Sequence, residues 1–488
     1  MRTKFIYLLL IAAVSGSAAA QDTLSLDDYR LRVLQYSYTL KQAAEQTRAA
    51  EAAVRGSYTG FLPQLSADGD FSINFRKRFQ SDRLLKPYSF SLQPALVQQI
   101  YVGGSVRDSY RQAQVNQDLF RLQEQQSELD VAYLAEYNYW NLASNKALLD
   151  ITTRYEAIVR EMFNVVQTRF DDGYVARNDL LMIQTRLQEA EFSRIQIENA
   201  YRISLHNFNI LMGEKPDAPR HAADSITQSV PPLQEIAPEE AVPSHPSYLI
   251  AGKQIDLQRY NVRLAASRFN PQLSAGVQGI WNTPSPNYHG QTRIDGLAFL
   301  RLNIPIFHWN ERRHTVHAAE ATLRSSQYAQ AAVADNLSVA ISNAWTNITE
   351  ANLQIATARS NLDVARENLS LNTFSYNEGV LTILDVISAQ LSWLQAYTNA
   401  VTAHFNEKVA ISAYKKAIGR YDFSRESARP SPPHDRGLRC DFQKQSGHPF
   451  TPSLPRDLAQ FEPPHTFFVN QGDHLADPHR FGGKLPDR

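Results

Sequence analysis

The sequence lacks the features that stabilise small secreted domains and those that mark helical membrane proteins. Among its 488 residues there is one cysteine, Cys440, which excludes an intramolecular disulfide and any cysteine-based zinc or iron–sulfur site. No apolar run reaches the ~18–20 residues that a membrane-spanning helix needs. Lysine plus arginine and aspartate plus glutamate number 49 each, so the net charge of zero gives no overall attraction to nucleic acid. At first these absences favour a soluble protein.

Glycine and proline are missing from four long stretches. Two of them, 105–172 and 306–378, are very long, and two shorter ones of equal length, 174–212 and 380–418, follow them. Because they are rich in good helix formers, these stretches predict very long helices. At a rise of about 1.5 Å per residue, the first would span roughly 100 Å. Apolar and small residues recur every three or four positions in the shorter stretches, which indicates coiled-coil packing.

The N-terminus has the pattern of a secretory signal peptide. Two cations, Arg2 and Lys4, precede an apolar run at 5–14, and small residues at 18–20 occupy the expected cleavage position. We therefore expect residues 1–20 to be removed on export.

The chain contains a duplication. The segment FLPQLSA at 61–67 recurs as FNPQLSA at 269–275, an offset of 208. A pattern of aromatic residue, glycine, aspartate and glutamine at 170–184 recurs at 376–390, an offset of 206. Two halves of about 200 residues therefore share one plan, a larger unit than the ~20–50 residues of solenoid repeats.

From about Ser424 the composition changes. Residues 424–488 hold 10 of the 24 prolines and five histidines without periodicity, so we expect a disordered tail. The expected organisation is a signal peptide at 1–20, a first repeat at 21–213, a linker at 214–247, a second repeat at 248–419 and the tail at 420–488.

Each repeat also contains a pair of segments in which polar and apolar residues alternate. The pairs are 61–75 with 88–100 and 269–283 with 293–306, and the alternation predicts strands with one polar and one apolar face. Each is as long as the ~9–11 residues that a strand needs to cross a bilayer, but about eight strands are needed to close a barrel. Since lipid does not tolerate open strand edges, a membrane location requires oligomerisation. A small soluble sheet is the alternative.

The order and spacing of these motifs over residues 24–420 resemble the TolC family of bacterial outer-membrane efflux proteins. The resemblance implies a mainly α fold with a β-barrel part. Duplicated long helical hairpins would form an α-helical tunnel, and four strands per chain would contribute to a 12-stranded barrel in a homotrimer. It implies a location in the outer membrane, in contact with its lipid, with the helical part in the periplasm.

The resemblance also implies a passive export channel of a tripartite efflux or type I secretion system. Its partners would be a periplasmic adaptor protein and an inner-membrane transporter of RND or ABC type, and no nucleic acid is expected. A periplasmic adaptor and a secreted pore-forming protein are the alternative functions.

Two glycine turns lie where the long helices reverse, so they should mark the periplasmic end of each hairpin. The resemblance implies that these ends close the tunnel aperture and contact the adaptor, whereas ordinary turn chemistry is the alternative. The selected residues are Phe170, Gly173, Tyr174, Val175, Asp179, Tyr376, Gly379, Val380, Leu381 and Asp385.

The two aspartates differ in their local sequence. Thr382 lies three positions before Asp385, which fits a capping box, whereas Ala176 replaces the hydroxyl before Asp179. Three copies of each carboxylate would alternatively form a ring that favours cations at a narrow mouth. Ser388 stands where well-known family members have a second aspartate, which argues against a strong ring.

No catalytic constellation is present. His314 and His317, with Glu311 and Glu320 nearby, lack the i, i+4 histidine pair of a zinc-protease helix, and a solvated helix face explains them. We expect no enzymatic activity, no cofactor and no metal.

Overall fold

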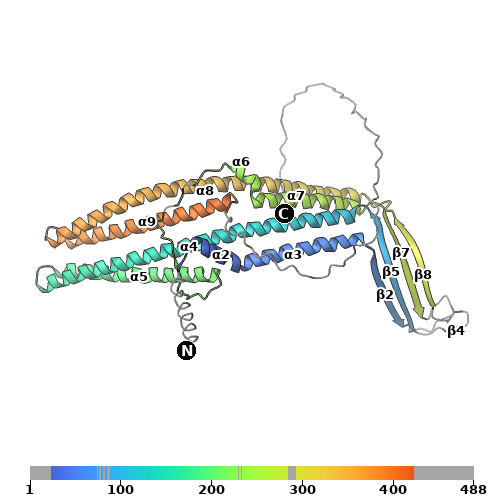
Figure 1. Ribbon diagram of the computed structural model, residues 1–488, viewed down its shortest axis with the longest axis horizontal. Helices are drawn as coiled ribbons and strands as arrows, with labels where there is room; N and C mark the ends of the chain where they lie inside the picture. Colours follow the sequence, from blue (N-terminus) through green and yellow to red (C-terminus); the bar gives the residue numbers. More distant parts are fainter. Residues whose placement is uncertain are drawn as a thin grey trace, which may run out of the picture. The chain divides into compact units, whose positions relative to one another are not determined.

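The computed structural model describes residues 23–73, 75, 79–80, 83–84, 88–228, 230–231, 233–283 and 293–421 (Figure 1). The expected signal peptide and the tail from residue 422 lie outside the described residues. The main helices are α2 (Leu26–Tyr36), α3 (Tyr38–Tyr58), α4 (Ser105–Asp171), α5 (Arg177–Leu211), α7 (Pro246–Ser267), α8 (Glu311–Asn377) and α9 (Ile383–Ala417). The main strands are β2 (Gln64–Ile73), β5 (Tyr88–Val102), β7 (Gln272–Thr283) and β8 (Arg293–Asn303). Shorter elements are β1 (Thr23–Leu24), η1 (Thr59–Phe61), β3 (Phe79–Gln80), β4 (Arg83–Leu84), β6 (His221–Ala222), α6 (Pro238–Ala241) and η2 (Val242–Ser244).

The stretches without glycine and proline form the predicted hairpins. Helices α4 and α8 have 67 residues each, and each is followed by a returning helix, α5 or α9, of 35 residues. Among the described helices, none combines the length and the apolar character that crossing a membrane requires.

The long helices lie side by side in one layer. Away from the sheet, α9 packs between α8 and α4, and α5 packs on the other side of α4 (Figure 1). Nearer the sheet, α3 lies beside α4 in place of α5, and α7 lies between α4 and α8 in place of α9. The order there is α3, α4, α7 and α8. Helix α8 therefore forms one edge of the layer along its length, while α3 and α5 form the other.

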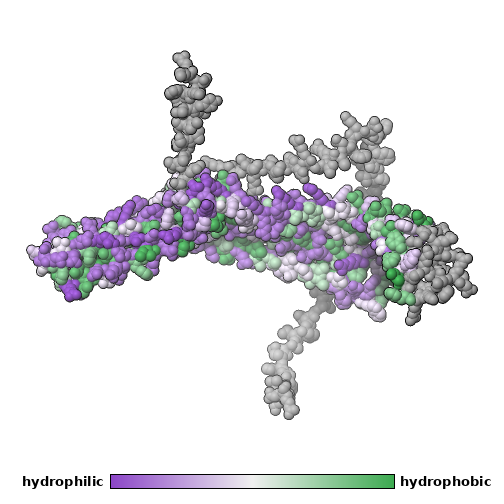
Figure 2. Space-filling view, turned by 90° about the horizontal axis from the view of Figure 1, so that it is seen from below, coloured by the Kyte–Doolittle hydropathy of each residue, from purple (hydrophilic) through white to green (hydrophobic). Residues whose placement is uncertain are grey.

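The four main strands form one antiparallel sheet in the order β2-β5-β7-β8. The register places the apolar members of all four strands on the same face, and Figure 2 shows hydrophobic residues gathered over this end of the chain. The face consists of Leu65, Ala67, Phe71, Ile73, Tyr88, Phe90, Leu92, Leu96, Leu273, Ala275, Val277, Trp281, Ile294, Ala298, Leu300 and Leu302. In the part of the chain that the structure describes, the outer edges of β2 and β8 have no strand partner.

Three strands are shorter than the sequence pattern predicts. Strands β2 and β7 begin after Pro63 and Pro271, because proline has no N–H to donate to a neighbouring strand. Strand β8 ends at Asn303, which lies opposite the first residue of β7, so the predicted residues 304–306 have no strand beside them.

Charged side chains are buried where the N-terminal helix, α4 and α9 meet. The carboxylate of Glu136 on α4 is 1% exposed and accepts from Arg30 Nη1 of α2 at 3.2 Å. Ser412 on α9 donates its hydroxyl to the same carboxylate, and the ammonium of Lys415 lies 3.8 Å from it. This cluster ties three helices together through one acid.

Candidate functional site: the hairpin ends

The first hairpin end is closed by backbone hydrogen bonds around a left-handed glycine. Gly173 has φ +78°. Its N–H donates to the carbonyl of Phe170 at 2.9 Å, and the N–H of Tyr174 donates to the carbonyl of Arg169 at 2.7 Å. This is the Schellman arrangement, in which glycine avoids the steric cost of the left-handed backbone.

The second hairpin end repeats this geometry. Gly379 has φ +77° and donates to the carbonyl of Tyr376 at 3.0 Å, while Val380 donates to Ser375 at 2.9 Å. A Cβ atom on either Gly173 or Gly379 would meet nothing within 4 Å. The backbone conformation, rather than lack of space, therefore requires glycine at both ends.

The selected residues differ in exposure. Tyr174 is 81% exposed and Val380 is 75% exposed, so these two project from the ends of the hairpins. Tyr376 is 5% exposed and packs in an apolar cluster formed by both hairpins, and its counterpart Phe170 is half-buried. Val175 and Asp179 are half-buried, whereas Leu381 and Asp385 are exposed.

A residue that the sequence did not single out connects the two ends. The guanidinium of Arg169, in the last turn of α4, donates to the carbonyls of Tyr376 at 3.3 Å and Asn377 at 3.2 Å. It also lies 4.8 Å from the centre of the Tyr376 ring. Arginine near a helix C-terminus suits the unpaired carbonyls there, but this one caps α8 instead of its own helix. The one feature of the sequence that distinguishes Arg169 is that the two repeats differ at this position, where the second repeat has Ser375.

The capping box predicted for Asp385 is present. The Thr382 side chain donates to Asp385 Oδ2 at 2.6 Å and the Thr382 N–H donates to the same oxygen at 3.0 Å. These bonds, the hydroxyl first, hold the pKa of the Asp385 carboxyl below its ordinary 3.8. Asp179 has no such side-chain donor at Ala176, so its carboxylate is left without a capping role.

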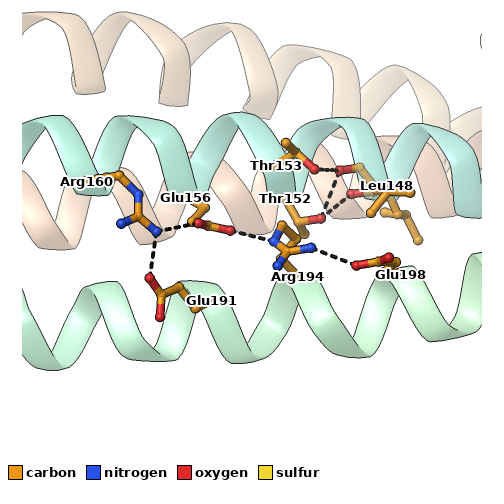
Figure 3. A network of polar contacts seen from close by, with 9 residues as sticks. Leu148, Thr152, Thr153, Glu156, Arg160, Glu191, Arg194 and Glu198 are labelled. Atoms are coloured by element: carbon orange, nitrogen blue, oxygen red, sulfur yellow. Dashed lines mark hydrogen bonds and ion pairs between the residues drawn. The ribbon is translucent and has the colours of Figure 1, made fainter.

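An ion network joins the two helices of the first hairpin (Figure 3). Arg160 on α4 contacts Glu156 at 2.7 Å and Glu191 of α5 at 2.6 Å, and Arg194 on α5 contacts Glu156 at 2.6 Å. Hydrogen bonds from Arg160 and then Arg194 lower the pKa of the Glu156 carboxyl. Arg194 also contacts Glu198 at 2.7 Å.

The second hairpin lacks this network. The counterparts of Glu156 and Arg194 in the second repeat are Leu362 and Ala400, which carry no charge. The first hairpin is therefore braced by ion pairs between its helices at a level where two of the equivalent positions in the second hairpin are uncharged.

Both halves of the chain match a known protein family. A model of the outer membrane efflux protein family matches residues 31–214 and 237–420, one segment for each half of the chain. The chain belongs to the outer membrane efflux protein family. The TolC-family resemblance, the mainly α fold with duplicated helical hairpins and four main strands, and the outer-membrane location with a periplasmic helical part are confirmed.

Curated relatives of this efflux protein are distant but cover most of its length. It is 23% identical over 440 residues to the outer membrane protein TolC of Vibrio cholerae, covering 85% of this chain and 95% of the relative. It is 22% identical over 423 residues to the outer membrane efflux protein BepC of Brucella suis, covering 85% and 89%. The alkaline protease secretion protein AprF of Pseudomonas aeruginosa is 24% identical, and the match covers 78% of each chain.

Solved structures share the fold of this efflux protein. The CmeC outer membrane channel of Campylobacter jejuni superimposes with a TM-score of 0.71 at 17% identity, covering 82% of this chain and 88% of CmeC. The outer membrane protein VceC of Vibrio cholerae gives 0.68 at 15% identity, covering 81% and 96%. The family and the fold of the chain are those of channel proteins, which are not enzymes. Within the described residues, no three histidine, cysteine, aspartate or glutamate side chains gather as a metal ion would require.

The Asp385 cap gives this efflux protein a pH-dependent helix start. Because the folded pKa of Asp385 lies below 3.8, its stabilisation is present above that pH and is lost as the pH falls through the folded pKa. We expect Thr382→Ala to raise the Asp385 pKa towards 3.8, so that acid unfolding begins at a higher pH. Circular dichroism of the purified protein during acid titration measures this.

Thr357→Ala is the control, because that hydroxyl bonds only to a carbonyl of its own helix, at 3.0 Å. Equal acid sensitivity in Thr382→Ala and Thr357→Ala would contradict the role assigned to the cap.

Proposed function

We propose that three copies of this efflux protein form a passive export duct, the outer-membrane component of a tripartite efflux or type I secretion system. Each of the expected repeats, 21–213 and 248–419, would supply one strand pair and one helical hairpin, with 214–247 as the linker between them. The three sheets would make a 12-stranded barrel and the hairpins a periplasmic tunnel. The observation that carries this proposal is the sheet, which has a bare apolar face and, within the described residues, two unpaired edges.

The exposure of the sheet supports a lipid-facing barrel. On the apolar face Leu65 is 76% exposed, Leu300 is 69% exposed and Ile294 is 78% exposed. Soluble monomers rarely leave so many large apolar side chains uncovered in one place. Closure of the sheet by neighbouring copies would pair both edges and leave this face to the hydrocarbon region, the arrangement required in a bilayer.

The edge helices support the same closure. Exposed apolar residues follow one stripe along α8, recurring after 11, 14, 11 and 7 positions: Tyr328, Val339, Leu353, Val364 and Leu371. A second stripe follows α5, recurring after 11, 11 and 7 positions: Leu181, Phe192, Ile203 and Ile210. Such spacings keep side chains on one seam of a helix. Because α8 forms one edge of the layer and α3 and α5 form the other, α8 of one copy can pack on α5 and α3 of the next, and repetition closes a ring.

The hairpin ends are the proposed contact with a periplasmic adaptor, through which an inner-membrane transporter of RND or ABC type would deliver cargo. Tyr174 and Val380 are exposed there with no packing role in the described chain, which leaves them available to a partner. The name of AprF records a secretion role for that relative, which agrees with a delivery system of this kind.

The same ends would form the aperture. Arg169 joins the last turn of α4 to the last turn of α8, and the ion network braces α4 against α5. The first hairpin would thus act as a stiff frame, and the second would move when the Arg169 contacts break. Rings of Asp179 and Asp385 at this mouth would favour cations.

Membrane fractionation with crosslinking tests the assembly and its partner. We expect the protein in the outer-membrane fraction as a heat-resistant trimer that conducts ions in a planar bilayer. A photoreactive residue in place of Tyr174 is expected to capture a second exported protein with a long helical hairpin, identified by mass spectrometry, whereas the same substitution at Tyr328, on the proposed seam, is expected to capture only another copy of this chain. A soluble monomer without conductance would overturn the proposal.

A further inference from the structure

The two joints between the sheet and the long helices are equivalent, although their sequences differ. Gly103 and Gly104, before α4, have φ values of 64° and 87°. At the equivalent positions of the second repeat, before α8, Trp309 and Asn310 have φ values of 45° and 63°, in the same left-handed region. Left-handed backbone is costly for residues with a Cβ atom, so its recurrence here shows that the duplication extends to the backbone at this point.

Strand β5 is longer than its counterpart β8. Val97 of β5 lies opposite Gln64, the first residue of β2, and Asn303 of β8 lies opposite Gln272, the first residue of β7. Val97 and Asn303 are equivalent positions, since their numbers differ by the same offset of 206 that relates the glycine turns. Beyond Val97, β5 continues to Val102 by pairing with β7 alone. Beyond Asn303, the described chain offers no such neighbour and the strand ends.

We infer that in the trimer proposed above, on which this inference rests, β8 continues through residues 304–308 by pairing with β2 of the next copy, in the register that β5 uses with β7. The register follows from the offsets between the two repeats. Each β5 residue corresponds to the residue 206 positions later, in or after β8, and each β7 residue corresponds to the residue 208 positions earlier, in or after β2. The observed pair Ala95 and Gln278 then becomes Arg301 opposite the partner subunit's Asp70. The pair Val97 and Gly276 becomes Asn303 opposite the partner subunit's Asp68.

The charges of the two strand edges agree with this register. Arg301 and Asp70 both alternate with apolar-face residues, so they lie on the polar face of the sheet. The described β2 edge carries Asp68 and Asp70 there, and the β8 edge carries Arg301. A shift of one residue would place arginine and aspartate on opposite faces, which the apolar pattern forbids. A shift of two would place Arg301 opposite Asp68 or Ser72 instead.

Arg301 is held in place for such a contact. Its guanidinium lies 5.2 Å from the centre of the Phe299 ring, and among the described residues no carboxylate forms an ion pair with it. The Phe299 ring in turn lies over Gly276, where a Cβ atom would come within 2.8 Å of it. The side chain is therefore positioned over the polar face at the open edge. Opposite charges directly across a strand pair stabilise the pairing.

The exposed segment between β8 and α8 gives a second reason to expect β2 of the next copy beside it. Ile306 is 90% exposed and Phe307 is 68% exposed, although both are large and apolar. In the inferred register Phe307 lies opposite the partner subunit's Leu65, whose side chain would cover it. Pro305 corresponds to Gln99, beside the register shift of β5, and irregular positions of this kind accept proline.

Cysteine crosslinking in a Cys440→Ser background tests the register. Directly opposite residues in an antiparallel pair have Cβ atoms about 4.5–5.5 Å apart, near enough for a disulfide after small adjustment. We expect Arg301→Cys with Asp70→Cys to give covalent dimers and trimers on a non-reducing gel. Ala95→Cys with Gln278→Cys is the matched control, because the same geometry inside one chain gives a disulfide without a covalent dimer.

Further cysteine pairs in the Cys440→Ser background distinguish a wrong register from the absence of a trimer. If Arg301→Cys instead crosslinks better with Asp68→Cys or Ser72→Cys, the inferred register is wrong although the trimer stands. If the Cys440→Ser protein itself is monomeric in the membrane, the proposed trimer fails as well.

Charge reversal measures the ion pair independently of disulfides. We expect Arg301→Asp and Asp70→Arg each to cause loss of the heat-resistant trimer at a lower temperature, and the double reversal to regain most of that loss. Asp295→Arg, on the same face of β8, gives no recovery when combined with Asp70→Arg. Additive losses in the double reversal would overturn the pairing.

Discussion

Replacing Arg169 with alanine is expected to raise the resting conductance of the proposed trimer in a planar bilayer by about tenfold. The substitution removes the two hydrogen bonds from the guanidinium to the Tyr376 and Asn377 carbonyls and its contact with the Tyr376 ring. A hydrogen bond to a charged group contributes about 1.5–3 kcal/mol, and a loss of ~1.4 kcal/mol from the closed state multiplies the open fraction by about ten. Single-channel recording without adaptor measures the effect directly.

Arg177→Ala is the matched control for charge. Arg177 is exposed at the start of α5, at the same hairpin end, so its removal changes the local charge equally. Its resting conductance should stay close to that of the wild type. A closed Arg169→Ala channel, or equal opening in both variants, would show that the contact between α4 and α8 does not hold the aperture shut.

Replacing Glu136 with glutamine is expected to destabilise the protein by about 1.5–3 kcal/mol. The glutamine removes the buried carboxylate that faces the guanidinium of Arg30, which is 12% exposed, and leaves that guanidinium its ion pair with Asp27, a residue 66% exposed, at 3.2 Å. Removal of one partner from a buried ion pair costs more than the pair contributes, because the remaining charge stays desolvated. The midpoint of thermal or denaturant unfolding, followed by circular dichroism, should fall accordingly.

Glu161→Gln, at an exposed position of the same helix, is the control and should shift the midpoint little. A double substitution tests whether the loss of stability comes from the contact between Glu136 and Arg30. In the Arg30→Met background, which removes the buried charge, Glu136→Gln should cost much less than in the wild type. Equal costs in both backgrounds would show that the two residues act independently.

The hairpins could be predicted from the sequence because their signals are local. The absence of glycine and proline from 105–172 predicts α4, which ends at Asp171, and a left-handed glycine follows each long helix. The capping box at Thr382 and Asp385 was equally predictable, because it depends on two residues within one helical turn. In each case one short segment determines its own geometry.

The contacts between segments could not be predicted in this way. Arg169 reaches carbonyls of the other hairpin, and any exposed arginine in a last helical turn has the same local sequence pattern. The end of β8 at Asn303 depends on a missing neighbour, which no local alternation of polar and apolar residues reports. The partners of Glu136 likewise come from separate helices, α2 and α9.

The two open edges of the sheet also govern how this protein matures. Strands β2 and β8 present unpaired N–H and C=O groups next to a bare apolar face, and within the described residues nothing covers them, a combination that readily recruits unrelated strands into aggregates. The pairing of β5 with β7 forms within one chain. In the proposed trimer, the pairing of β8 with β2 would require an encounter between two chains. Its rate therefore depends on protein concentration, and the lifetime of the unassembled chain determines its exposure to aggregation and proteolysis. Slow export or dilute expression should harm this protein before any loss of intrinsic stability does.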